Sequence, residues 1–225
     1  MRRYHLTQII KEEVQRALAI EDNKILIPRR LEGRWDKKIQ DYVKNGCIGD
    51  LNLEGAQITE LPPNLKKVGG TLWLRETKIT KLPDDLEVEG GLYLDNTQIT
   101  ELPKGLKVGL DLALAKSKIT KLPDDLEVGV SLYLNYTPIT ELPKGLKVRG
   151  SLWLVGTKIT KLPDNLEVDA SLHIEDTLIT ELPRGLRIGS HLHIAGTSLL
   201  EKYPAGQLKW MIRKLGGIVG GEVFV

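Results

Sequence analysis

Three histidines near the C-terminal end of the chain carry the side chains with the clearest chemical potential. They are His173, His191 and His193, and an acidic residue, Glu175, lies two positions after the first. Imidazole nitrogens and a carboxylate are donors that zinc prefers. On a flat surface, however, nothing encloses a metal or holds its ligands in place, so the alternative is four exposed polar residues. We predict no bound cofactor and keep these four residues as the candidates for a metal site.

A second set of residues, mostly aromatic, recurs at intervals of twenty positions. Polar residues flank it two positions further on, and Ala113 interrupts it. Aromatic anchors surrounded by polar groups are typical of binding hot spots. The alternative is an aromatic ladder that only stabilises a sheet. The predicted ligand-binding residues are Trp73, Tyr93, Tyr133, Trp153, His173, His193, Arg75, Asp95 and Asn135.

The scaffold that must position these residues repeats with the same period. Leu recurs at 72, 92, 112, 132, 152, 172 and 192, and Leu-Pro recurs from 82–83 to 182–183. A fixed period of this length predicts a solenoid, in which each repeat forms one coil and stacking makes a continuous core. The alternation between 86 and 95 predicts one half-buried strand per coil, in a parallel sheet. The segment 97–106 then crosses over, with Ile99 and Leu102 inward and a turn at Pro103.

The repeat resembles the leucine-rich repeat. Its core is Leu92-x-Leu94-x-x-Thr97-x-Ile99, and the following Leu102-Pro103-x-x-Leu106 is similar to the short bacterial LPX subclass of secreted effectors and to repeats of phage proteins. The resemblance implies an α/β solenoid with a parallel β-sheet on its concave face, an extended convex wall and helical caps. Thr or Ser replaces the family's inward Asn, and we expect its hydroxyl to bridge neighbouring coils. A parallel β-helix is the alternative fold.

The ends of the chain depart from the repeat, and a solenoid needs caps. We predict a helical N-terminal cap over 1–47, with helices at 7–19 and about 34–44, and a solenoid of about eight coils over 48–200, beginning at Ile48. A C-terminal cap over 201–225 would consist of a helix at 205–215 and a strand at 222–225. The alternative for 6–19 is a docking or packaging segment.

Charges on the predicted wall alternate in sign from one coil to the next, which replaces repulsion between neighbouring coils by attraction. The columns are Lys81, Glu101, Lys121, Glu141, Lys161 and Glu181; Asp84, Lys104, Asp124, Lys144, Asp164 and Arg184; and Glu87, Lys107, Glu127, Lys147, Glu167 and Arg187. We interpret them as a solvated wall that fixes register. An ionic binding wall is the alternative.

The composition excludes several classes of function. A formal charge of +2 gives no basic footprint for nucleic acid, the single cysteine excludes an internal disulfide, and no apolar run approaches a membrane span or signal peptide. We therefore predict a non-enzymatic module, cytoplasmic or virion-associated, that binds a protein or, as the alternative, a glycan on its concave face. The other hypotheses are a structural or assembly component like those of phages, supported by the segment 8–13, and a zinc hydrolase. The sequence does not indicate an oligomeric state.

Overall fold

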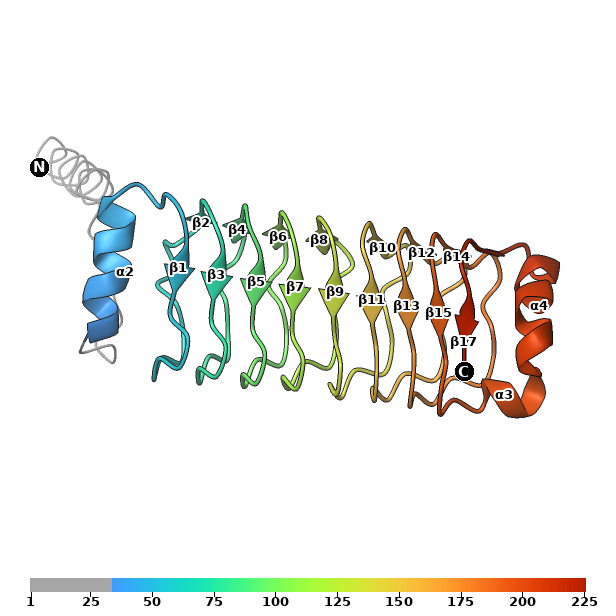
Figure 1. The fold of residues 1–225 in the computed structure, drawn as a ribbon. Helices are drawn as coiled ribbons and strands as arrows, with labels where there is room; N and C mark the ends of the chain where they lie inside the picture. The colour runs from blue at the N-terminus through green and yellow to red at the C-terminus, as the bar shows by residue number, and fades with distance from the viewer. Residues whose placement is uncertain (1–33) are drawn as a thin grey trace, which may run out of the picture.

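Residues 34–225 are described by the structure, a computed structural model, and they form a row of stacked coils with a helix at either end (Figure 1). The predicted helix at 7–19 and the segment 8–13 lie outside the described residues. Each coil contributes one short strand to a sheet that runs the whole length of the row. The structure therefore confirms the predicted parallel α/β solenoid.

The odd-numbered strands form this sheet, which we call the long sheet. It has nine strands in the order in which they occur along the chain, all paired in parallel. Equivalent residues of neighbouring coils lie opposite each other, as Leu92 and Leu112 do. The strands are Leu51–Asn52 (β1), Leu72–Trp73 (β3), Leu92–Tyr93 (β5), Leu112–Ala113 (β7), Leu132–Tyr133 (β9), Leu152–Trp153 (β11), Leu172–His173 (β13), Leu192–His193 (β15) and Val223–Phe224 (β17).

The even-numbered strands form two separate four-stranded sheets, which together make up what we call the outer wall. The prediction of one strand per coil over 86–95 is wrong, because the chain bends between Val88 and Leu92. Val88 and Leu92 are both buried, so the alternation of inward and outward side chains continues around this corner of the coil. One sheet contains Lys67–Val68 (β2), Glu87–Val88 (β4), Lys107–Val108 (β6) and Glu127–Val128 (β8), and the other Lys147–Val148 (β10), Glu167–Val168 (β12), Arg187–Ile188 (β14) and Ile218–Val219 (β16).

The third charged column lies on the strands of the outer wall, and the other two lie on the segments that lead from the long sheet to that wall. In the third column, ion pairs join Lys107 to Glu127 at 3.9 Å and Lys147 to Glu167 at 3.0 Å, and in the first column Lys121 lies 3.8 Å from Glu141. No ion pair closes within the second column among the described residues. The alternation thus produces direct pairs in two of the three columns, and all of these pairs are exposed to solvent.

A threonine follows most strands of the long sheet and is buried, as predicted, but it does not bridge neighbouring coils. Thr157 Oγ1 donates a hydrogen bond of 2.7 Å to the carbonyl of Leu154 in its own coil, and its backbone N–H reaches the same oxygen at 3.1 Å. Gly156, in the left-handed region with φ of 66°, makes the tight turn that brings them together. The prediction of an inter-coil bridge is therefore wrong. Thr77, Thr97, Thr137, Thr177 and Thr197 make the same bond within their own coils.

The helix Arg34–Lys44 (α2) ends the row on the N-terminal side, where the sequence predicts a helix at about 34–44. Ile39 and Tyr42 are buried, and the Tyr42 hydroxyl lies 2.8 Å from the carbonyl oxygen of Cys47 and accepts a bond from the Gly69 N–H. Ile48 is 80% exposed, so its side chain does not belong to the core of the first coil. The first fully buried side chain after the helix is that of Leu51.

The C-terminal end of the row carries two short helices, Leu199–Lys202 (α3) and Leu208–Lys214 (α4), with a 3-10 turn at Ala205–Gln207. Leu208 and Ile212 are buried, as the predicted helix at 205–215 requires. The predicted last strand forms as β17 and pairs with β15. The division of the chain into two caps and a solenoid domain stays a prediction.

No helix within residues 34–225 has the length and apolar character needed to cross a membrane.

Candidate functional site

The predicted aromatic residues share one column on the long sheet, which we call the aromatic column. Pairing in register places Trp73 opposite Tyr93 and Trp153 opposite His173. Because parallel strands lie about 4.8 Å apart, rings at matched positions can stack face to face. Their centroids lie 4.3 Å apart for Trp73 and Tyr93, 5.9 Å for Tyr133 and Trp153, 3.4 Å for Trp153 and His173, and 4.1 Å for His173 and His193.

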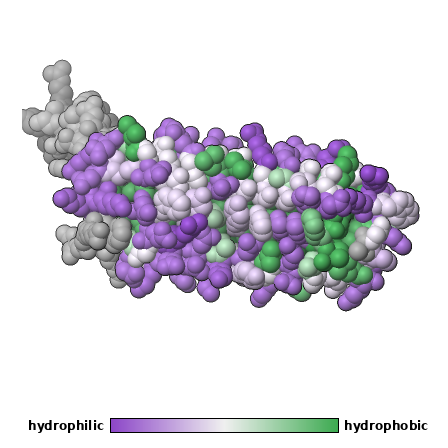
Figure 2. Space-filling view, in the orientation of Figure 1, coloured by the Kyte–Doolittle hydropathy of each residue, from purple (hydrophilic) through white to green (hydrophobic). Residues whose placement is uncertain are grey.

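The column is less exposed than the sequence suggested. Trp73, Tyr93, Tyr133 and Trp153 are half-buried, and His173 is buried with 7% of its surface exposed. Ala113 is also buried, between the positions of two larger rings. The physical reason is that each stacked ring covers the face of its neighbour. Figure 2 shows residues of intermediate hydropathy over much of the long sheet, with strongly hydrophilic residues along its edges.

One member of the column, Phe224, was missed. It pairs with His193 in register, and the two rings stack with centroids 4.6 Å apart. Its side chain is exposed. The sequence did contain a signal, because Val219-x-Gly221-x-Val223-Phe224 has the hydrophobic and aromatic spacing of Val88-x-x-x-Leu92-Tyr93. The eleven extra residues that carry α4 put it out of period with the coils before it.

Arg75 completes the N-terminal part of the column. Its guanidinium lies over the rings of Trp73 and Tyr93, 5.1 and 4.4 Å from their centroids, and its Nε donates to Asp95 Oδ2 at 2.8 Å. Burial raises the pKa of the Tyr93 phenol, with a smaller contribution from Asp111. Arg75, Asp95 and the two rings therefore form one ordered cluster, as a pre-organised binding surface requires.

The polar residues beside the column continue the hydrogen bonding of strands that are only two residues long. Asp95 Oδ1 accepts the Ala115 N–H at 3.0 Å, and Asn135 Oδ1 accepts the Val155 N–H at 3.2 Å. On the other side of the column, Ser151 Oγ accepts an N–H from the next coil. Asp95 and Asn135, both predicted to bind a ligand, thus also have a structural role, which the sequence pattern alone did not reveal.

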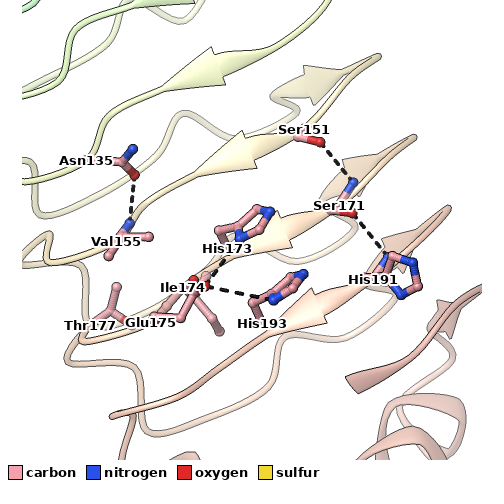
Figure 3. A network of polar contacts seen from close by, with 10 residues as sticks. All are labelled: Asn135, Ser151, Val155, Ser171, His173, Ile174, Glu175, Thr177, His191 and His193. Atoms are coloured by element: carbon pink, nitrogen blue, oxygen red, sulfur yellow. Dashed lines mark hydrogen bonds and ion pairs between the residues drawn. The ribbon is translucent and has the colours of Figure 1, made fainter. Parts of the chain in front are cut away.

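The structure brings together three of the four metal candidates (Figure 3). Glu175 Oε1 lies 3.2 Å from His173 Nδ1 and 3.9 Å from His193 Nδ1. Burial lowers the pKa of His193, with a further contribution from His173. His191 is not part of the cluster, because its Nδ1 accepts the Glu222 N–H at 3.0 Å.

Two polar atoms in this part of the column are buried without a hydrogen-bond partner, Glu175 Oε2 and Trp153 Nε1. A buried polar atom that has lost its water and gained no partner costs free energy, about 1–3 kcal/mol in mutational series. The two atoms belong to neighbouring coils in the C-terminal part of the long sheet.

Comparisons with known proteins bear on the fold. No protein-family model matches the sequence, and no curated protein is similar enough to match. Among solved structures, the chain is similar to one titled "Structure of Shigella effector LRR domain", with 20% identity, a TM-score of 0.59, and coverage of 87% of this chain and 91% of that chain. At this level of identity the likeness supports the fold alone. The chain therefore has the fold of a leucine-rich repeat protein, a parallel solenoid of short repeats, as its repeat motif predicted.

Proposed function

We propose that the protein is a non-enzymatic recognition module that binds another protein through the aromatic column of the long sheet. The observation that carries the proposal is the column itself, half-buried rings held in stacks by in-register strands. When a partner removes such partly covered apolar surface from water, the free energy of the system falls, which favours binding. Solenoids commonly use such extended faces for binding.

The arrangement of the rings favours a protein partner over a glycan. Both faces of His173 and one face of Tyr93 are covered by neighbouring rings, so the stacks offer few open ring faces to a ligand. A sugar ring packs best on an open aromatic face, whereas protein side chains pack well against edges. Ala113 separates the two stacks, and we expect an apolar side chain of the partner to lie above it.

The alternative, an assembly component, gains no support from the described residues. Its argument came from the segment 8–13, which lies outside them. The zinc hydrolase hypothesis would require a general acid or base beside a metal-bound water, and the rings stacked on the histidine cluster, Trp153 and Phe224, supply neither. We therefore keep recognition as the proposed function.

The test compares two matched variants of the purified protein. One carries Trp73→Ala and Trp153→Ala in the column, and the control carries Lys121→Ala and Lys161→Ala, which are exposed and lie away from the column. Wild-type protein is used to capture partners, the captured protein is identified and purified, and its affinity for all three forms is measured. We expect the column variant to bind about thirtyfold or more weakly, because a hot spot contributes about 2 kcal/mol or more. Equal affinity of the column variant and the wild type would reject recognition by the column.

A further inference from the structure

We propose that His173, His193 and Glu175 bind a divalent transition metal ion, with zinc as the expected metal. His173 ends β13 and His193 ends β15, the neighbouring strand, while Glu175 follows His173 in the turn after β13. Their ligand atoms all lie within 4.8 Å of one another, the one such group among the residues that the structure describes. Two imidazoles and a carboxylate make a donor set that zinc uses when a coordination position stays open.

The distances between the ligand atoms are close to those of a metal site. Zinc binds histidine nitrogen and carboxylate oxygen at about 2.0–2.2 Å, so the ligand atoms of a tetrahedral site lie about 3.3–3.6 Å apart. The measured distances are 3.2 Å from Glu175 Oε1 to His173 Nδ1 and 3.9 Å from the same oxygen to His193 Nδ1. These two distances lie within a few tenths of an ångström of that range, and the orientation of the rings needs the larger adjustment.

An independent observation also points to a cation. Glu175 Oε2 is buried and has no hydrogen-bond partner, although a carboxylate oxygen is a strong acceptor. Glu175 Oε1 faces both histidines. Glu175 Oε2 has lost its hydration, and no group among the described residues compensates for that loss. A metal ion next to this carboxylate would offset that loss.

Metal binding requires a change in the stack. The rings of His173 and His193 are almost parallel, with an interplanar angle of 12°, whereas a metal lies in the plane of each imidazole that binds it. His193 is the ring with room to turn, because 26% of its side chain is exposed, compared with 9% for His173. Turning it gives up stacking on Phe224. Trp153 stays in contact with His173 and lies close enough to report on the metal.

The first experiment titrates untagged, chelator-treated full chain with Zn²⁺ in a calorimeter and with Co²⁺ by visible absorption. We expect one ion per chain and the intense spectrum of tetrahedral Co²⁺. The variants His193→Gln and Glu175→Gln should bind at least about tenfold more weakly, since loss of even a supporting group has that effect. His191→Gln is the matched control and should bind like the wild type, because its ring is engaged with Glu222. No binding by the wild type, or an equal loss in the control, would overturn the proposal.

The second experiment places the ion without relying on substitution of a ligand. Co²⁺ quenches the fluorescence of a nearby indole, and Trp153 stacks on His173 at 3.4 Å. We expect Co²⁺ to quench the wild type and to quench Trp153→Phe far less. Thermal midpoints of all variants without metal check that each is folded. Quenching of equal size in the two proteins would place the ion elsewhere and contradict the site. Neither experiment includes a protein partner, so their failure leaves the proposed recognition function standing.

Discussion

The long sheet and the outer wall are built from the same coils, yet only the long sheet is continuous. It pairs strand to strand from β1 to β17, whereas the wall divides into two sheets because β8 and β10 are not paired. Near this division an open cleft of about 920 Å³ lies on the surface, lined in part by Leu122, Pro123, Leu142 and Pro143. One side of every coil is therefore tied to its neighbours, and the other side has a seam.

The two sides also differ in what they contribute to the free energy of folding. Behind the long sheet, side chains such as Leu132 and Leu152 are fully buried, and burial of each stabilises by about 1.5–3 kcal/mol as an upper bound. On the wall, neighbouring coils are joined in part by exposed ion pairs, each of which contributes only about 0–1 kcal/mol. Coils should therefore separate first along the wall, and substitutions on the two sides should differ in effect.

The largest expected effect comes from a core residue of the long sheet. Leu132→Ala removes a fully buried side chain from β9 and should lower the free energy of unfolding by about 2–5 kcal/mol. Leu126→Ala, in the same coil but beside the seam, removes a side chain that is only partly buried and should have a smaller effect. Denaturant unfolding of both variants measures the difference. Equal losses would mean that the seam is as tightly packed as the sheet.

The next prediction concerns the surface of the long sheet. Trp153→Ala removes the ring that stacks on Tyr133 and His173, and such contacts contribute about 0.5–1.5 kcal/mol each beyond burial. We expect a moderate fall in the thermal midpoint together with a loss of about 2 kcal/mol or more in partner binding. Both are measured on the same preparation. A large loss of stability with unchanged binding would show that the column only supports the sheet.

A third prediction uses the buried hydroxyls at the edge of the long sheet. Thr97 Oγ1 donates a bond of 2.7 Å to the Leu94 carbonyl, and Thr97→Val should cost about 0.5–1.5 kcal/mol. Ser117 occupies the equivalent position in the next coil, but its Oγ is buried without a partner. Ser117→Ala should therefore leave stability unchanged or raise it slightly. Chemical denaturation of the two variants tests this contrast, and a clear loss for Ser117→Ala would contradict it.

The smallest expected effect is on the outer wall. Lys147→Glu reverses one partner of the pair with Glu167, which is 3.0 Å long and exposed, and should destabilise by no more than about 1 kcal/mol. The loss should shrink at high salt, because salt screens exposed charges. Lys104→Glu, in the column where no pair closes among the described residues, should have a still smaller effect. Melting curves at low and high salt check both, and a loss that salt does not change would exclude an electrostatic cause.

Much of the long sheet could be predicted from the sequence. The period of twenty residues placed Leu92 and Leu112 opposite each other, and the same register placed Trp73 beside Tyr93. The prediction was less successful where the period is broken. Phe224 was missed because α4 lengthens its repeat, and Ile48 was taken into the first coil although it is exposed. A period locates residues only as long as every coil has the same length.

The candidate site was predictable in its members but not in its contacts. The sequence selected His173, His193 and Glu175 together with His191, and only the side-chain directions separated His191 from the others. Likewise, the pattern located Asp95 and Asn135 beside the column without indicating that their oxygens accept backbone N–H groups. Such roles depend on distances between coils, which a list of residue types does not contain.

The repeat, the inward leucines and the register follow from the sequence alone, because a side chain in a strand points inward or outward according to its position in a period of two. Three features depend on the tertiary structure: the bend of the coil between Val88 and Leu92, the seam in the outer wall, and the polar atoms that remain without a partner. The physical reason is that alternation specifies a direction for each side chain relative to its own strand. Hydrogen bonds, ring stacking and ion pairs between coils depend on how far one coil lies from the next. The packing of the whole solenoid determines that distance.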